Sequence, residues 1–141
     1  MTAPLALTAA RIAMIDPLKA VVKSYIAGVA ITKGQPVYII AATGKIGLCT
    51  GAAANQAAQF RGIALNAGSA GQAIDVLEDG EVEGYTLTGA YDAIVYVDDV
   101  AGNLSETTGT VGVIVGRISP MSNGARTPVV RIFVSRGTTW S

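Results

Sequence analysis

The stretch VYIIAATGKI, from Val37 to Ile46, decides the fold that this sequence predicts. Its β-branched and aromatic residues indicate a strand, and Gly44 indicates the turn from which a second strand returns. A later stretch, VYVDDVAGNL from Val95 to Leu104, has a Val-Tyr pair and a glycine in the same relative positions. Neither copy contains a chemical group that a duplicated active site would need. What the two copies share is shape, so the repetition indicates two similar β units.

The correspondence extends beyond these two stretches. With small gaps, further pairs align: Arg61–Ala64 with Val115–Ile118, Ala73–Val76 with Val129–Ile132, and Gly80 with Gly137. The two halves, about residues 20–88 and 89–138, therefore repeat the same order of strands and glycine turns. Because a lone hairpin is marginal in water, we expect the halves to bury their apolar faces on each other. In a chain with 17 glycines some matches arise by accident, so common ancestry and chance both stay open.

Short strands between glycine-rich turns account for most of the remaining chain. Strands are predicted at Val21–Val22, Tyr25–Ile26, Val29–Ile31, Phe60–Leu65, Ala73–Leu77, Glu81–Gly84, Ala93–Val97, Val111–Ile118 and Val129–Val134. Asp79-Gly80 predicts a hairpin turn, because both central residues of a type I′ turn need positive φ. The alanine-rich piece Gly51–Gln59 predicts a short helix that only tertiary contacts would hold. Residues 18–141 are therefore expected to form a single, mainly β domain. We expect a small β-barrel or β-sandwich built from two similar β units, with an extended N-terminal arm and at most one or two short helices.

The composition is low in charge. Only 14% of the 141 residues are charged, against roughly 25% in an average domain, and the net charge is zero. A partner that covers part of the surface would explain this, although an alanine- and glycine-rich composition would also lower the figure. The basic residues are scattered, which argues against a nucleic-acid partner. No basic leader and no apolar run of about 18 residues is present, so we expect a soluble protein made in the cytosol, with no membrane contact.

Residues 1–17 differ from the rest of the chain. They contain no glycine, and Pro17 disfavours helix at Asp16. The segment is too apolar for a solvated tail, so we interpret it as an arm that packs on a neighbouring chain, with a frayed terminus as the alternative. Trp140 is either an anchor into a neighbour or simply the end of the chain. The candidate residues for contact with a neighbouring chain are Leu5, Leu7, Ile12, Met14, Ile15 and Trp140.

The residues that would support catalysis or metal binding are missing or scattered. There is no histidine, and the single cysteine, Cys49, is most simply a small buried apolar residue. Nucleophile-elbow and phosphate-loop motifs are absent. Two groups of acidic residues could offer oxygen ligands, but neither has the calcium-loop spacing, so both are interpreted as solvated turns. These groups are Glu78, Asp79, Glu81 and Glu83, and Asp98, Asp99 and Glu106. We expect no enzyme activity, no cofactor and no metal site.

One longer phrase resembles a known family. YIAGVAITKGQPVYI, Tyr25–Ile39, is similar to the opening of the small capsid cement (decoration) proteins of tailed bacteriophages, the DUF2190 family. Later phrases of the chain fit the same pattern of glycines and hydrophobic residues. They are Gly62–Leu65, Ala70–Val82, Val95–Asp98, Gly102–Ser105 and Val115–Ile118. The resemblance covers roughly residues 25–135 and leaves the N-terminal segment unmatched.

The resemblance implies a small β-rich barrel that assembles as a homotrimer. It also implies a virion location, on the outer surface of the expanded capsid. There such proteins clamp adjacent subunits of the major capsid protein and stabilise the head. We therefore expect the major capsid protein and further copies of this chain as partners.

Two other hypotheses stay open at this point. A receptor- or carbohydrate-binding module of a phage fibre or spike would need an exposed aromatic patch, and the tyrosines are sparse. A small β-barrel enzyme or accessory domain finds no support in the residues.

Overall fold

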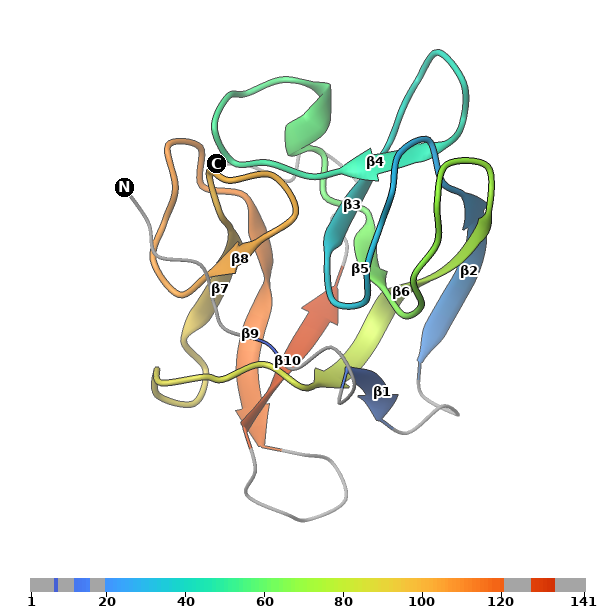
Figure 1. Cartoon of the computed structure of the whole chain (residues 1–141). Helices are drawn as coiled ribbons and strands as arrows, with labels where there is room; N and C mark the ends of the chain where they lie inside the picture. The colour runs from blue at the N-terminus through green and yellow to red at the C-terminus, as the bar shows by residue number, and fades with distance from the viewer. Residues whose placement is uncertain (1–6, 8–11, 16–19, 121–127, 134–141) are drawn as a thin grey trace.

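The computed structural model describes Leu7 and residues 12–15, 20–120 and 128–133. Within these ranges the chain forms strands joined by turns, with one short 3₁₀ helix (Figure 1). The mainly β fold predicted from the sequence is confirmed. The elements are β1 Ala13–Ile15, β2 Val21–Ile26, β3 Pro36–Ile39, β4 Ile46–Leu48, η3 Gln56–Ala58, β5 Gly62–Ala64, β6 Ala73–Glu83, β7 Ile94–Val97, β8 Leu104–Ser105, β9 Ile114–Pro120 and β10 Pro128–Phe133.

Strand β6 is the longest strand and forms the centre of the sheet. Along one edge it pairs first with β5 and then with β10. Along the other edge it pairs first with β2 and then with β1. All four ladders are antiparallel. β6 therefore has a hydrogen-bonded neighbour on both sides over most of its length.

Strands β1 and β2 follow the same edge of β6 in the same direction. Ile15 lies opposite Glu81, and Val21 lies opposite Asp79. Residues 16–20 separate the first pair from the second in the chain, but only Gly80 separates their partners. The two segments are therefore distinct strands that pair with successive parts of one edge of β6.

The hairpin turn predicted at Asp79-Gly80 is wrong, because β6 runs straight through it. Gly80 has a φ of 142°, far from the value near 60° of a type I′ turn, and Asp79 does not have positive φ. Partner strands on both edges hold β6 extended on either side of the glycine. A side chain at Gly80 would meet Ala20 Cβ and Leu77 Cδ1 at 3.2 Å each, so the position is also crowded.

The order of strands in the sheet is symmetric. It runs β4-β3-β5-β6-β10-β9-β7-β8, so the two halves of the chain meet where β6 pairs with β10. In each half a hairpin, β3–β4 or β7–β8, is followed by a strand that joins it to the centre. This is the strand correspondence that the repeated phrases predict. Gly44 and Gly102 have φ of 73° and 83°, so both copies use a left-handed glycine to reverse the chain.

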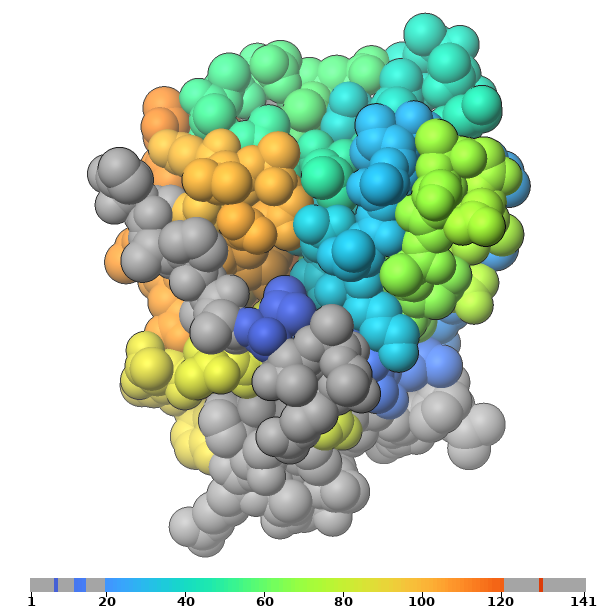
Figure 2. All heavy atoms as spheres, in the orientation of Figure 1, coloured from blue at the N-terminus to red at the C-terminus, as the bar shows by residue number. Residues whose placement is uncertain are grey.

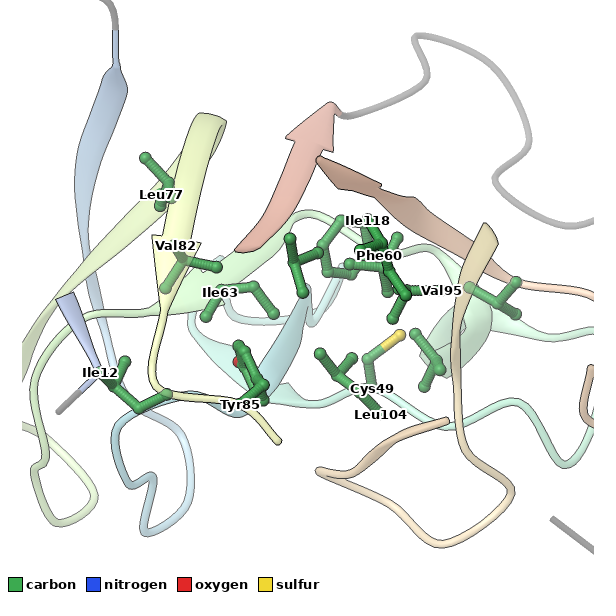
Figure 3. Packing of buried hydrophobic residues seen from close by; sticks show 14 of the residues in the cluster. Ile12, Cys49, Phe60, Ile63, Leu77, Val82, Tyr85, Val95, Leu104 and Ile118 are labelled. Carbon is green, nitrogen blue, oxygen red and sulfur yellow. The ribbon is translucent and has the colours of Figure 1, made fainter. Parts of the chain in front are cut away.

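The apolar interior consists of two clusters on opposite faces of β6. The first lies between the two halves of the sheet (Figure 3) and contains Ile12, Cys49, Ala58, Phe60, Ile63, Leu77, Val82, Tyr85, Val95, Val97, Leu104, Val113, Val115, Ile118 and Val130. The second contains Ala27, Ile31, Val37, Ile46, Ala64, Ile74 and Val76. Because adjacent residues of a strand point to opposite faces, the neighbours Val76 and Leu77 are both fully buried, one in each cluster.

The two ends of the sheet approach each other without forming a ladder. The Gly51 N–H donates to the Asp98 carbonyl at 2.9 Å, and the Gly102 N–H donates to the Cys49 carbonyl at 2.9 Å. Figure 2 shows the turn after β7 lying against the segment that follows β4. The sheet is thus curled so that its halves face each other in a sandwich-like arrangement, and no ladder between β4 and β8, its two end strands in the described ranges, closes it into a barrel.

The helix predicted over Gly51–Gln59 is reduced to the single 3₁₀ turn η3. Gly51, the first residue of this segment, is held outside a helix by two hydrogen bonds to distant residues. Its N–H donates to the Asp98 carbonyl, and its carbonyl accepts from the Val111 N–H at 2.8 Å. The residues that remain are too few for a stable α-helix. The Asn55 side chain caps the turn by accepting from the Ala57 N–H at 3.0 Å.

The conformation of Gly80 predicts a difference between two glycine substitutions. Gly80→Ala should lower the free energy of unfolding by about 2 to 3 kcal/mol, because its φ is reserved for glycine and its surroundings are crowded. Gly44→Ala should cost about 1 kcal/mol, because nothing lies within 4 Å of the new methyl group. Urea unfolding of both variants checks this. Equal costs would mean that the strand does not constrain Gly80.

Candidate functional site

The outer edge of β2 is the candidate interaction site. The inner edge of β2 pairs with β6, whereas no described strand forms a ladder with the outer edge, which meets β4 only at its end, at the bridge between Ala27 and Ile46. Figure 1 shows β2 at the margin of the molecule. All its residues are exposed except Tyr25, which is half-buried.

This edge is apolar. Val21, Val22 and Ile26 are 53%, 40% and 43% exposed, and Lys23 is the only charged residue of the strand. Proteins usually blunt a free edge with charges, prolines or short strands, because unpaired N–H and C=O groups attract other strands. A free strand edge that keeps apolar side chains is typical of a surface that contacts another protein chain.

The free backbone groups of the edge follow from the hydrogen bonds at its end. The Ala27 N–H donates to the Gln72 carbonyl at 2.9 Å, and the Ala27 carbonyl accepts from the Gly71 N–H at 2.8 Å, so Ala27 bonds inward. In an antiparallel pair, residues alternate between bonding to the partner and pointing away from it. Val22, Ser24 and Ile26 therefore point their backbone groups outward. The bridge of Ala27 to Ile46 places β4 beside Ile26, whereas no described segment pairs with the outward groups of Val22 and Ser24.

The opposite strand supports this assignment. Asp75 of β6 lies directly opposite Ser24. Its carbonyl accepts from the Leu65 N–H at 2.8 Å, on the other edge of β6. Asp75 therefore turns its backbone away from β2, as it must if Ser24 points outward.

Side chains also fasten β2 to β6. The Tyr25 hydroxyl donates to Glu78 Oε2 at 2.5 Å, and the Ser24 hydroxyl donates to Asp75 Oδ1 at 3.1 Å. Burial and the Glu78 carboxylate raise the pKa of Tyr25 to about 12, so its hydroxyl remains a donor at neutral pH. The Lys23 ammonium lies 5.1 Å from the centre of the Tyr25 ring. The edge is thus a preformed surface rather than a loose strand.

The described part of the predicted arm lies on the chain's own core. Ile12 is only 3% exposed within the first cluster, and Leu7 and Met14 are half-buried against it. Leu7 also forms a backbone bridge to Tyr85, and Ile15 pairs with Glu81 in β1. The sequence alone predicts instead that these residues contact a neighbouring chain. The remaining candidates, Leu5 and Trp140, lie outside the described residues, so their contact with another chain stays a prediction.

The acidic residues of the second group stabilise turns. Asp99 accepts from the Thr110 N–H at 2.9 Å and from its hydroxyl at 2.7 Å. These hydrogen bonds hold the pKa of Asp99 below its usual value. Glu106 likewise accepts from the Thr88 N–H at 2.8 Å and from its hydroxyl at 2.9 Å. Among the described residues, no group of three or more His, Cys, Asp or Glu side chains could hold a metal ion.

The thiol and one tyrosine are enclosed in the core. Cys49 is fully buried, as predicted, and burial raises the pKa of its thiol to about 12. The Tyr85 hydroxyl donates to the Gly34 carbonyl at 2.5 Å, and burial raises the pKa of Tyr85 well above its usual value. Neither group is available to a reactant in this fold. Within the described ranges no helix has the length and apolarity that a membrane crossing requires.

The sequence analysis missed β2 as a candidate site. It treated Val21-Val22 and Tyr25-Ile26 as ordinary strand residues. The sequence does contain a sign of it. The strand has four apolar or aromatic residues and only one charged residue, Lys23, which is unusual for an edge strand. That β2 is an edge strand becomes visible only in the sheet order.

Comparison with known proteins adds no relative. No family model matches the chain, and no curated protein matches it either.

The position of Ile12 predicts a loss of stability on truncation. Ile12→Ala should lower the free energy of unfolding by about 2 to 4 kcal/mol, because it opens a cavity in the first cluster. The exposed Val21→Ala is the matched control and should change it by no more than about 0.5 kcal/mol. Urea unfolding measures both. An Ile12 variant as stable as the parent would show that the arm does not pack on this core.

The enclosure of Cys49 predicts slow thiol labelling. In the native protein, reaction with an aromatic disulfide reagent at pH 8 should be at least about 10³-fold slower than in denaturant, because the thiol reacts only after unfolding. The labelling rate should rise with urea in step with the unfolded fraction. Labelling at the rate of the denatured chain would contradict the burial of Cys49.

Proposed function

We propose that this chain is a decoration (cement) protein of a tailed-bacteriophage head. In this proposal it binds the outer surface of the expanded capsid and stabilises the shell by bridging major capsid protein subunits. The observation that carries the proposal furthest is the exposed apolar edge of β2, because such an edge is typical of surfaces that contact another protein chain. The resemblance of residues 25–135 to phage cement proteins supports a phage head as the assembly.

The mechanism is structural rather than chemical. Each copy would bury apolar surface against its neighbours, and many copies on one shell would give avidity, so that weak single contacts suffice. The low charge of the chain fits a protein whose surface is largely covered in its working state. A homotrimer, and a location on the outside of the virion, belong to the same proposal.

The binding of sugars or a receptor has less support. Of the described tyrosines, Tyr85 is buried and Tyr25, Tyr38 and Tyr96 are half-buried. Only Tyr91, at 49%, is exposed. A single exposed ring does not make the stacking platform that carbohydrate recognition uses.

Binding to phage heads tests the proposal. Purified protein is mixed with expanded and with unexpanded heads that lack it, and the bound fraction is measured by co-sedimentation. We expect saturable binding to the expanded heads alone and a higher temperature of head disruption after binding. Failure to bind heads of either form would refute the proposal.

A short deletion tests the residues of the arm that precede Leu7. Removing residues 2–16 would also remove Ile12 and β1 from the folded domain, so it is the wrong variant. Removing residues 2–6, which include Leu5, leaves Leu7, Ile12 and β1 in place. We expect this variant to unfold at the same urea concentration as the parent but to occupy fewer sites on the expanded head. Full occupancy would exclude a role for Leu5 in the contact.

A further inference from the structure

We propose that neighbouring copies of this chain exchange their arms, so that Leu7 and residues 12–15 of one copy fill the arm groove of the next. The arm groove consists of the groups that hold these residues, which are residues 81–83 of β6, Gly34 and Tyr85. The exchange deepens the proposed function and rests on it, because the phage head is what would gather the copies. It identifies a second copy as the partner and the arm as the segment that passes between them.

The arm groove is shaped to hold an apolar strand. β1 pairs with β6 in an antiparallel ladder in which Ala13 lies opposite Glu83, and Ile12 beside it is only 3% exposed. A Cβ atom at Gly34 would lie 3.1 Å from Ile12 Cδ1 and 3.2 Å from Leu7 Cδ2, so the glycine leaves room for the arm. An empty groove would expose apolar surface and unpaired backbone groups. Every copy therefore needs an arm in its groove.

The contacts that hold the arm do not distinguish one copy's arm from another's. The groove is formed by residues far along the chain from the arm, at positions 34 and 81–85. Because the copies are identical, an arm from a second copy would form the same ladder and the same apolar contacts. Exchange therefore costs no contact, and the choice of groove depends on the linker and on the distance to the neighbour.

The linker between the arm and the domain is longer than the gap that it crosses. Ile15 lies opposite Glu81 and Val21 lies opposite Asp79, so the two ends of the linker are about 7 Å apart along the edge of β6. When extended, residues 16–20 reach roughly 20 Å. The linker can therefore also carry the arm to a neighbouring groove that begins within this distance.

The residue types of the linker favour the longer path. Pro17 has a fixed φ and biases Asp16 towards an extended conformation. Within one chain, residues 16–20 have to fit into a distance that about two extended residues would span. Exchange removes this requirement, because the linker then runs towards the neighbour.

Exchange around a ring leaves no groove empty. If each of three copies gives its arm to the next, every arm is bound and every groove is filled, which fits the proposed homotrimer. Copies held side by side on one shell also meet their neighbours' arms at a high effective concentration, in the millimolar range for short linkers. Assembly on the head would therefore favour exchange over the closed arm.

Disulfide formation between two different variants tests the exchange. Ala13→Cys and Glu83→Cys are made in separate chains, mixed in urea, refolded together at about 1 mM and oxidised mildly. The two positions lie opposite each other in the ladder, within disulfide range, but neither chain can form this bond alone, and Cys49 is buried. We expect a covalent dimer in the mixture and none in either variant by itself.

Two controls make the result specific. A chain that carries both substitutions should cross-link completely, which shows that the geometry allows the bond. A mixture of Ser24→Cys and Asp75→Cys places a similar opposite pair between β2 and β6, which stay in one chain, and should give no covalent dimer.

The same mixtures are added to expanded heads, and occupancy and cross-linking are measured in one sample. Complete cross-linking of the double variant, with no covalent dimer from the first mixture either in solution or on occupied heads, would overturn the exchange and leave the proposed function standing. Heads that bind no protein would refute the proposed function instead, because the refolded mixture tests the exchange without them.

Discussion

Hydrogen bonding along both edges of β6 is the constraint on which the rest of the structure depends. β5 and β10 occupy one edge, and β2 and β1 occupy the other. Because its backbone is satisfied on both sides, β6 stays extended through Gly80 and can bury side chains on both faces. For this reason Val76 and Leu77 pack in different clusters. The two halves of the chain are joined in the sheet by the pairing of β6 with β10.

The same constraint places β2 at the margin. β6 offers its outer side to β2, and the chain then leaves at Gly28 to bond with Ile46 of β4. Apart from this contact with β4 at its end, no described strand pairs with the outer edge of β2, so the backbone groups of Val22 and Ser24 and the two valine side chains are exposed. An assembly function uses such an edge, whereas an enzyme would need reactive groups gathered in one place. Asp99 and Glu106 accept hydrogen bonds within turns, Asp75 and Glu78 accept hydrogen bonds from β2, and the Cys49 thiol is buried.

Local patterns predicted the strands well where the residues themselves carry the signal. The runs at Val37, Phe60 and Ile94 became β3, β5 and β7, and the repeated phrase predicted that the halves share one strand order. The errors came from residues whose local preference lost to distant partners. Asp79-Gly80 has the residue types of a turn, but the strands that pair with β6 on both edges keep it extended. The alanine-rich segment Gly51–Gln59 has a high helix propensity, but the backbone of Gly51 is hydrogen-bonded to Asp98 and Val111.

The sequence by itself determined that this protein is built of short strands and glycine turns in two similar units, and that it lacks histidine chemistry. Those properties depend on residue type and spacing, which act within a few positions along the chain. Only the tertiary structure decided that Ile12 belongs to the chain's own core and that β2 keeps a free edge. Both depend on which strands pair across long stretches of sequence, and pairing is governed by the cooperative packing of the whole sheet rather than by local preference.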